Sequence, residues 1–241
     1  MLKVAVDHKV SLRRLGLLAA IVAFSAAVLG VASAKPVCSA APAPGVDWTE
    51  CDKKVIILSG SDFNGATLVG TDFTSTDLRD SNLLAANFEK ATLVRASLAG
   101  SKADGAKFNR IEAYRTNFSR MSAQGATFAS AEMQRSNFTG AKLVNVDFTK
   151  AELGRAEFAD AEISGAKFSL ANLARADFTK ARFETPLDFA NSFLFLTRIE
   201  GIDLSAATGL AQWQIDMSCG DGSTKLPEGL KPASSWPCKF D

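Results

Sequence analysis

Arginine recurs in this chain at intervals of twenty residues, and three residues before three of these arginines stand Glu112, Glu132 and Glu152. Guanidinium groups bind carboxylates and phosphates, so such a set could dock an acidic protein or an anionic polymer. The alternative is a network of ion pairs between the two sets, worth only about 0–1 kcal/mol for each exposed pair. The five arginines are Arg95, Arg115, Arg135, Arg155 and Arg175.

The sequence offers little that could support catalysis. Its single histidine, His8, lies in the N-terminal segment, so the rest of the chain cannot form histidine triads, histidine metal sites or imidazole acid–base pairs. Asp and Glu are spread over polar positions, and no pair has an apolar setting that would shift a pKa. A glycine-rich phosphate loop and a Cys-x-x-Cys pair are also missing. We therefore expect no enzyme activity, catalytic residue, cofactor or metal.

A five-residue repeat must position the arginines. A small residue, any residue and then Phe or Leu recur from Ser61-Asp62-Phe63 to Ala181-Arg182-Phe183, which gives 25 central positions, twelve of them Phe and eight Leu. This period is neither that of a strand nor that of a helix, and a short fixed repeat indicates a solenoid. We expect the small and central residues to point inward and the others to face water.

Two exceptions and two longer periods sharpen this interpretation. Where Ile111 and Met121 fill the small position, Ala113 and Ala123 fill the central one. Volume-conserving exchanges are typical of residues that share one close-packed core. Phe recurs every ten residues from position 108 to 178 and Arg every twenty, which predicts a coil with four sides of five residues.

The register slips once. Phe183 is followed by a central Phe189 six residues later, and Pro186 lies between them. Proline cannot donate to a ladder, so it suits a bulge or corner. We expect one inserted residue here and then a final coil that reaches Leu204.

The repeat resembles the pentapeptide-repeat family over residues 56–205. Ser61–Gly65, Ala171–Arg175 and Ala176–Lys180 are good copies of the pattern small, Asp/Asn, Leu/Phe, polar, Gly or polar. The resemblance implies an all-β fold, a right-handed quadrilateral β-helix of about seven coils and roughly 35 Å in length. Some relatives inhibit DNA gyrase because their acidic rod resembles DNA.

The N-terminal segment 1–34 is typical of a signal peptide, with a basic start, an apolar stretch from Leu15 to Val31 and cleavage expected after Ala34. A twin-arginine signal at Arg13-Arg14 and an uncleaved anchor are alternatives. We expect a periplasmic or secreted protein with no stable membrane span after cleavage. The other expected regions are an N-terminal linker and cap (35–55) and a C-terminal cap (206–241) with a short helix at about 210–218.

Both caps contain the tryptophans and cysteines that the repeats lack. Trp48 precedes the repeats, Trp213 and Trp236 follow them, and large apolar rings can cover the open ends of a solenoid. If the caps lie at opposite ends of a rod, bonds between caps are too long, which leaves Cys38–Cys51 and Cys219–Cys238. Export makes oxidation plausible. Free thiols or a metal site are the alternatives.

The charge balance argues against nucleic-acid binding, and it also argues against a protein that mimics DNA. The whole chain carries +1, and about −2 remains once the basic signal region is removed. A DNA mimic needs a strong negative field and a DNA-binding protein a basic excess. We expect a structural or protein-interaction scaffold of the bacterial envelope, with an unknown protein or an anionic glycan on the arginines as partner, and a gyrase-interacting DNA mimic as a remote alternative. The resemblance also implies that a homodimer could form through the C-terminal cap.

Overall fold

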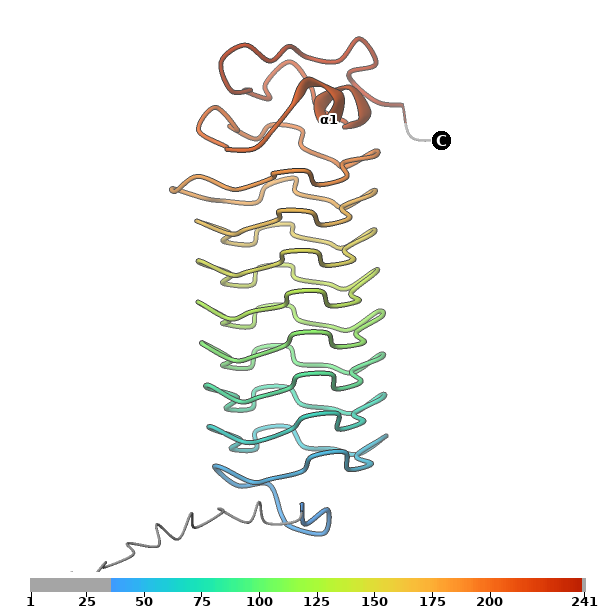
Figure 1. Ribbon diagram of the computed structural model, residues 1–241, viewed down its shortest axis with the longest axis vertical. Coiled ribbons are helices and arrows are strands. Elements are labelled where there is room, and N and C mark those ends of the chain that lie inside the picture. Colours follow the sequence, from blue (N-terminus) through green and yellow to red (C-terminus); the bar gives the residue numbers. More distant parts are fainter. Residues whose placement is uncertain (1–35, 240–241) are drawn as a thin grey trace, which may run out of the picture. The chain divides into compact units, whose positions relative to one another are not determined.

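The computed structural model describes residues 36–239, so the expected signal peptide lies outside the described residues. The described chain winds into coils stacked one on another, with a cap at the C-terminal end (Figure 1). These residues form one helix, α1 (Gln212–Met217), and no strand longer than a single bridging residue. The fold is a β-helix solenoid; its right-handed winding and the count of about seven coils stay predictions.

Parallel bridges between residues twenty apart hold each coil on the next. The ladder Glu112–Glu132–Glu152 is one example, and backbone bonds such as that from Phe108 N–H to the Thr127 carbonyl oxygen, 2.7 Å, accompany the bridges. Four such ladders run along the rod, which confirms four sides of five residues. We number the sides in chain order by the first bridging residue of each ladder: Asp47, Asp52, Ile57 and Asp62.

The first coil begins earlier than the repeat pattern indicated. Asp47 already bridges to Thr67, and Trp48 is buried against Phe63 at a ring distance of 5.2 Å. Trp48 lies fifteen residues before Phe63 and therefore occupies a central position in register. The segment expected as a linker and cap thus supplies part of a coil. Lys53 hides this continuity in the sequence, because it stands where Phe or Leu is expected.

Phenylalanine rings fill the core in two stacked columns. Phe108 lies 4.6 Å from Phe128 at an interplanar angle of 7°, whereas rings of different columns meet edge to face, as Phe128 and Phe138 do at 89°. Both arrangements are favourable for aromatic pairs. The columns confirm the ten-residue period of Phe. They comprise Phe88, Phe108, Phe128, Phe148, Phe168 and Phe189 on one side, and Phe118, Phe138, Phe158 and Phe178 on the opposite side.

The small inward positions serve packing and hydrogen bonding together. Ile111, Ala113, Met121 and Ala123 are all fully buried, so the exchanged volumes do share one core. Where the position holds Ser or Thr, the hydroxyl usually donates to a carbonyl of the preceding coil. These bonds run from Thr71 to Trp48, Thr76 to Lys53, Ser81 to Leu58, Thr116 to Leu93, Ser136 to Ala113 and Thr197 to Leu173. These hydroxyls therefore keep a partner on burial, whereas the buried hydroxyl of Ser101 has none among the described residues.

Most corners are tight turns whose third residue has a positive φ. The bond from Ala131 N–H to the Phe128 carbonyl oxygen, 3.1 Å, closes one such turn, and Ser130 within it has φ 58°. A positive φ at this position is the requirement of a type II turn and favours glycine. Asp or Asn before the central residue often accepts a bond from the next turn amide, as Asp147 does from Thr149 N–H at 2.8 Å.

The slip in register is confirmed. Glu162 still bridges to Arg182, twenty residues on, whereas Lys167 bridges to Asp188, twenty-one residues on. The extra residue bends out beside Pro186. Leu187 then enters the core at a position that is usually small, and Phe189 rejoins the Phe column 5.4 Å from Phe168.

Helix α1 covers the last coils and is shorter than the predicted range. Ala211 precedes the helix and has no side-chain oxygen that could cap it. Its backbone N–H donates to Gln214 Oε1 at 2.8 Å. The buried Gln214 amide also donates to the carbonyl oxygens of Phe189 and Ser192, both at 2.9 Å. One polar side chain therefore caps the helix start and fixes the helix on the coil below.

Replacing Phe148 with Ala should lower the free energy of unfolding by about 3–5 kcal/mol, because a fully buried ring in a stack would leave a cavity. Urea unfolding followed by far-UV circular dichroism measures the loss. Phe193→Ala, at a half-exposed ring, is the control and should cost less than about 1 kcal/mol. Equal losses in the two variants would contradict a stacked core.

Candidate interaction surface

The five arginines predicted from sequence lie at one corner of the rod, between the second and third sides. All are exposed, and their φ angles lie between 58° and 60°. Because corresponding residues of successive coils bridge at strand spacing, their backbones follow one another at about 4.8 Å. We call Arg95, Arg115, Arg135, Arg155 and Arg175 the arginine column.

The expected ion pairs between the arginine column and Glu112, Glu132 and Glu152 do not form. Within residues 36–239, no nitrogen of the column lies within 4.0 Å of a carboxylate oxygen. The glutamates stand on the flat second side, whereas the arginines leave from the corner after it. Glu152 Oε2 instead accepts from Asn172 Nδ2 at 2.8 Å, and Arg115 lies 5.6 Å from the centre of the Tyr114 ring.

The backbone at this corner would favour glycine, yet the column has none. Glycine alternates with Asp80, Arg120, Asp160 and Lys180 at the corner between the third and fourth sides, as Gly60, Gly100, Gly140 and Gly201. Between the fourth and first sides glycine predominates, as Gly65, Gly105, Gly125 and Gly165, beside Ala85 and Asn145. A side chain in the left-handed region costs roughly 1–2 kcal/mol. Five like charges in a row add repulsion. The left-handed backbone therefore gives no reason of its own for arginine at these positions.

Other basic groups border the same side. Lys90, Arg110 and Lys150 occupy the corner between the first and second sides, and of these only Arg110 has a carboxylate partner among the described residues, Glu89 at 3.4 Å. A shallow hollow of about 250 Å³ lies at the arginine column, lined by Gln134, Arg135, Gly154, Arg155, Ala174 and Arg175. The second side is thus flanked by positive charge on both edges.

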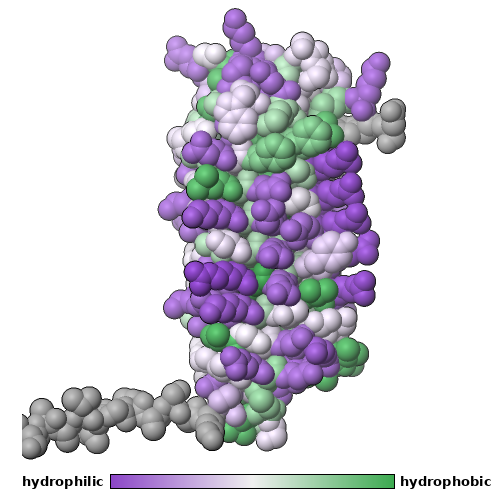
Figure 2. Space-filling model, turned by 45° about the vertical axis from the view of Figure 1, so that its right-hand side comes forward, coloured by the Kyte–Doolittle hydropathy of each residue, from purple (hydrophilic) through white to green (hydrophobic). Residues whose placement is uncertain are grey.

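Aromatic residues end this side toward the C-terminus. Phe193 bridges from Asn172, and Arg175 N–H donates to the Phe195 carbonyl oxygen at 2.8 Å, so both rings continue the surface beyond the arginine column. Each ring is 43% exposed, and their centres are 6.1 Å apart. Figure 2 shows hydrophilic side chains following one another along the rod and apolar side chains exposed near its ends. The sequence signal was Phe193, at a position that is polar in every earlier coil, followed two residues later by Phe195, and it was missed.

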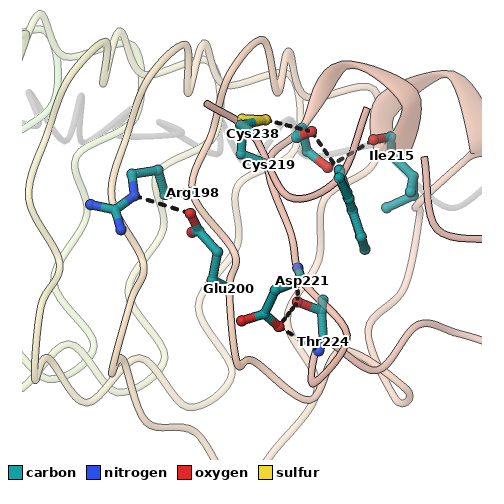
Figure 3. The surroundings of a disulfide bond; sticks show 9 residues. Arg198, Glu200, Ile215, Cys219, Asp221, Thr224 and Cys238 are labelled. Atoms are coloured by element: carbon teal, nitrogen blue, oxygen red, sulfur yellow. Dashed lines mark hydrogen bonds and ion pairs between the residues drawn. A yellow bond between two sulfur atoms is a disulfide. The ribbon is translucent and has the colours of Figure 1, made fainter. Parts of the chain in front are cut away.

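Both cysteine pairings expected for a rod with two caps are confirmed. Cys38 is bonded to Cys51 and Cys219 to Cys238, with Cα atoms 5.5 and 5.4 Å apart. The second bond ties the C-terminal loop over the last coils (Figure 3). In the described chain no group of three His, Cys, Asp or Glu side chains could hold a metal ion. None of its helices has the length and apolar character needed to cross a membrane.

Hydrogen bonds and one ion pair set the electrostatics of the C-terminal cap. Bonds from Ser223 lower the pKa of Asp221 to about 2, and bonds from Lys225 and Ser205 lower the pKa of Asp203 to about 2. Lys225 Nζ lies 2.8 Å from Asp203 Oδ2. These shifts have structural causes, namely turn bonds and a surface ion pair, and indicate no acid–base site.

The tryptophans of the cap play different roles. Trp236 packs on Gly220, where a Cβ atom would come within 2.5 Å of its ring, and its Nε1 donates to the Ser218 carbonyl oxygen at 2.7 Å. Trp213 on α1, expected to cover a core end, is 48% exposed. About half of Trp213 is therefore accessible to solvent, and the residue does not form part of the buried core.

Comparison with known families gives a match to Pentapeptide repeats at residues 56–93, 81–120, 114–149 and 156–184, together about half of the chain. The chain belongs to this family. Pentapeptide repeat proteins are generally structural or interaction modules. No curated protein sequence matches the chain.

Two solved structures illustrate the likeness. QnrB1, a plasmid-mediated fluoroquinolone resistance protein, is 17% identical with a TM-score of 0.43, over 74% of this chain and 85% of that one. HetL, a pentapeptide repeat protein involved in heterocyst differentiation regulation in the cyanobacterium Nostoc sp. strain PCC 7120, is 20% identical with a TM-score of 0.32, over 76% and 84%.

Arg135→Gly should be more stable than Arg135→Ala by about 1 kcal/mol, because alanine keeps the cost of the left-handed backbone and glycine removes it. Urea unfolding of both variants beside the parent measures the difference. If the alanine variant equalled or exceeded the glycine variant, the corner strain at the arginine column would be refuted.

Gly220→Ala should displace Trp236 and break its bond to Ser218, with a loss of about 1–3 kcal/mol from overpacking. In a Trp213→Phe background only the buried Trp48 emits beside Trp236, and the summed emission should shift to longer wavelength. Gly222→Ala, where no atom lies within 4 Å of the added Cβ, is the control and should leave emission unchanged. An unshifted spectrum for Gly220→Ala would contradict the packing described.

Proposed function

We propose that this protein is an exported, non-enzymatic interaction scaffold of the bacterial envelope that holds an acidic protein along its arginine column. One observation carries the proposal: five exposed arginines with no carboxylate partner among residues 36–239 occupy a corner where glycine would be less strained. Carboxylates of a partner would supply the negative charge that the described part of the chain does not place beside these arginines. Guanidinium groups are well suited to this because they bind carboxylates through two bonds.

Export is supported by the N-terminal sequence and by the cysteines. Disulfides persist in oxidising compartments such as the bacterial periplasm, and both pairs in this chain are at bonding distance. The signal-like segment 1–34 precedes the first of these cysteines directly. A periplasmic or secreted scaffold accounts for both features.

A protein partner fits the surface better than an anionic glycan does. Phe193 and Phe195 extend the arginine column with half-exposed rings, and aromatic anchors beside arginine are typical of protein interfaces. The glycan alternative draws on the regular spacing of one cation per coil, which a repeating anionic polymer could match. A DNA-mimic role has little support, since the chain is near neutral and this corner is basic.

Charge reversal tests the proposal. The triple variant Arg115→Glu, Arg135→Glu, Arg155→Glu should capture the acidic partner from envelope extract at least about tenfold less than the parent, with capture by the parent weakened by salt. The control reverses three exposed lysines on other sides, Lys107→Glu, Lys142→Glu and Lys167→Glu, and should bind as the parent does.

Equal loss in both triple variants would assign the binding to net charge and contradict a role for the arginine column. Unchanged capture by the arginine variant would reject the role outright. Protease digestion of the extract separates the two partner classes: capture that survives digestion would identify the glycan and overturn the protein partner.

A further inference from the structure

The N-terminal end of the rod presents an open backbone edge. In the first coil, the residues on either side of each bridging residue make the hydrogen bonds to the second coil. The N–H and C=O groups of the bridging residue itself point the other way, toward the N-terminal end of the rod. Within the described residues, the backbone N–H and C=O groups of Asp47, Asp52, Ile57 and Asp62 accordingly have no backbone partner. Such groups are a template for pairing with another strand.

The first, second and fourth sides each carry an aspartate at this edge, whereas the third side carries none. Asp47 accepts from Thr49, Asp52 lies 3.4 Å from Lys54 Nζ, and Asp62 accepts from Asn82 Nδ2 at 2.8 Å. Charged side chains at an edge oppose strand pairing. The third side carries Ile57 instead, which is 81% exposed.

The apolar character of this edge is confined to the first coil. Val55 beside Ile57 is 76% exposed and Ile56 is 37% exposed. At the position of Ile57, every later coil of the third side carries a polar or charged residue up to the C-terminal cap. These residues are Asp77, Ser97, Asn117, Asn137, Glu157, Asp177 and Arg198. The repeat therefore accepts polar residues here, and packing does not require isoleucine.

The N-terminal cap is fastened elsewhere. The Cys38–Cys51 bond, the bond from Lys53 Nζ to the Cys38 carbonyl oxygen at 2.7 Å, and Lys53 over the Trp48 ring at 3.6 Å hold the cap against the first and second sides. Burial in this cluster lowers the pKa of Lys53. The high exposure of Val55 and Ile57 shows that the third side remains uncovered by the described cap.

We propose that a second copy of this chain covers the edge, pairing antiparallel with Ile57 opposite Ile57 across a two-fold axis. In an antiparallel ladder, two residues directly opposite can exchange both N–H···O bonds, and Ile57 has both groups open. A two-fold contact brings the same patch from both copies together, so it must suit itself. An uncharged Val55–Ile57 patch meets this requirement, whereas the three Asp edges would repel their own copies.

The contact is small, since each copy contributes one short edge and a few apolar side chains, so the dimer should be weak and dependent on concentration. It differs from a dimer through the C-terminal cap, and it brings two rods together at their N-terminal ends.

Sedimentation equilibrium of the protein as secreted, at up to about 1 mM, tests the pairing. The parent should dimerise, Ile57→Val should dimerise similarly, and Ile57→Asp should weaken association at least about tenfold. Ile57→Asp should fold normally because Asp77 occupies the same position one coil later. Hydrogen exchange adds a site-specific readout: the Ile57 amide should become protected as concentration rises, while the Asp52 and Asp62 amides should not.

Three results would overturn the proposal. The parent could remain a monomer over the whole range, whether or not the segment before residue 36 is retained. Ile57→Asp could associate as the parent does. Association could instead be lost in Trp213→Asp at the C-terminal cap, with Ile57 exchange independent of concentration.

Discussion

Parallel bridges between residues twenty apart, each made of backbone hydrogen bonds, hold each coil on the one before it and place like positions directly above one another. Phe residues twenty apart therefore stack, those ten apart alternate between two opposite sides, and Arg residues twenty apart share one corner. Because each side contributes only one bridging residue per coil, the buried rings and the Ser and Thr hydroxyls supply the remaining cohesion. The arrangement of both the core and the surface therefore follows from the twenty residues in each coil.

Because the coils are so regular, each residue can be compared with those at the same position in the other coils. Most positions repeat a packing or turn requirement, so residues that depart from it need another explanation. Arginine stands at a turn position that two other corners often fill with glycine, Phe193 stands where the earlier coils are polar, and Ile57 stands where three other edges use Asp. All three departures lie on exposed surface, and interaction with partners is the common reason that we propose.

The sequence predicted the core and the four sides because side-chain volume and period report them directly, as at Ile111 and Ala113. The cysteine pairs followed once two separate caps were assumed. The first coil was hidden by Lys53, whose stem and charge sit against Trp48 and Cys38 in place of an apolar side chain. The missing ion pairs of the arginine column depend on how the corner directs its side chains, which spacing along the chain does not reveal.

Deleting residues tests most directly whether each coil requires twenty residues. Removing residues 126–145 takes out one whole coil and leaves the Phe columns and the arginine column aligned, whereas removing only residues 141–145 shifts everything after them by one side. Urea unfolding should show the five-residue deletion to be less stable than the twenty-residue deletion, although it removes a quarter as many residues. A five-residue deletion as stable as the twenty-residue one would contradict the account.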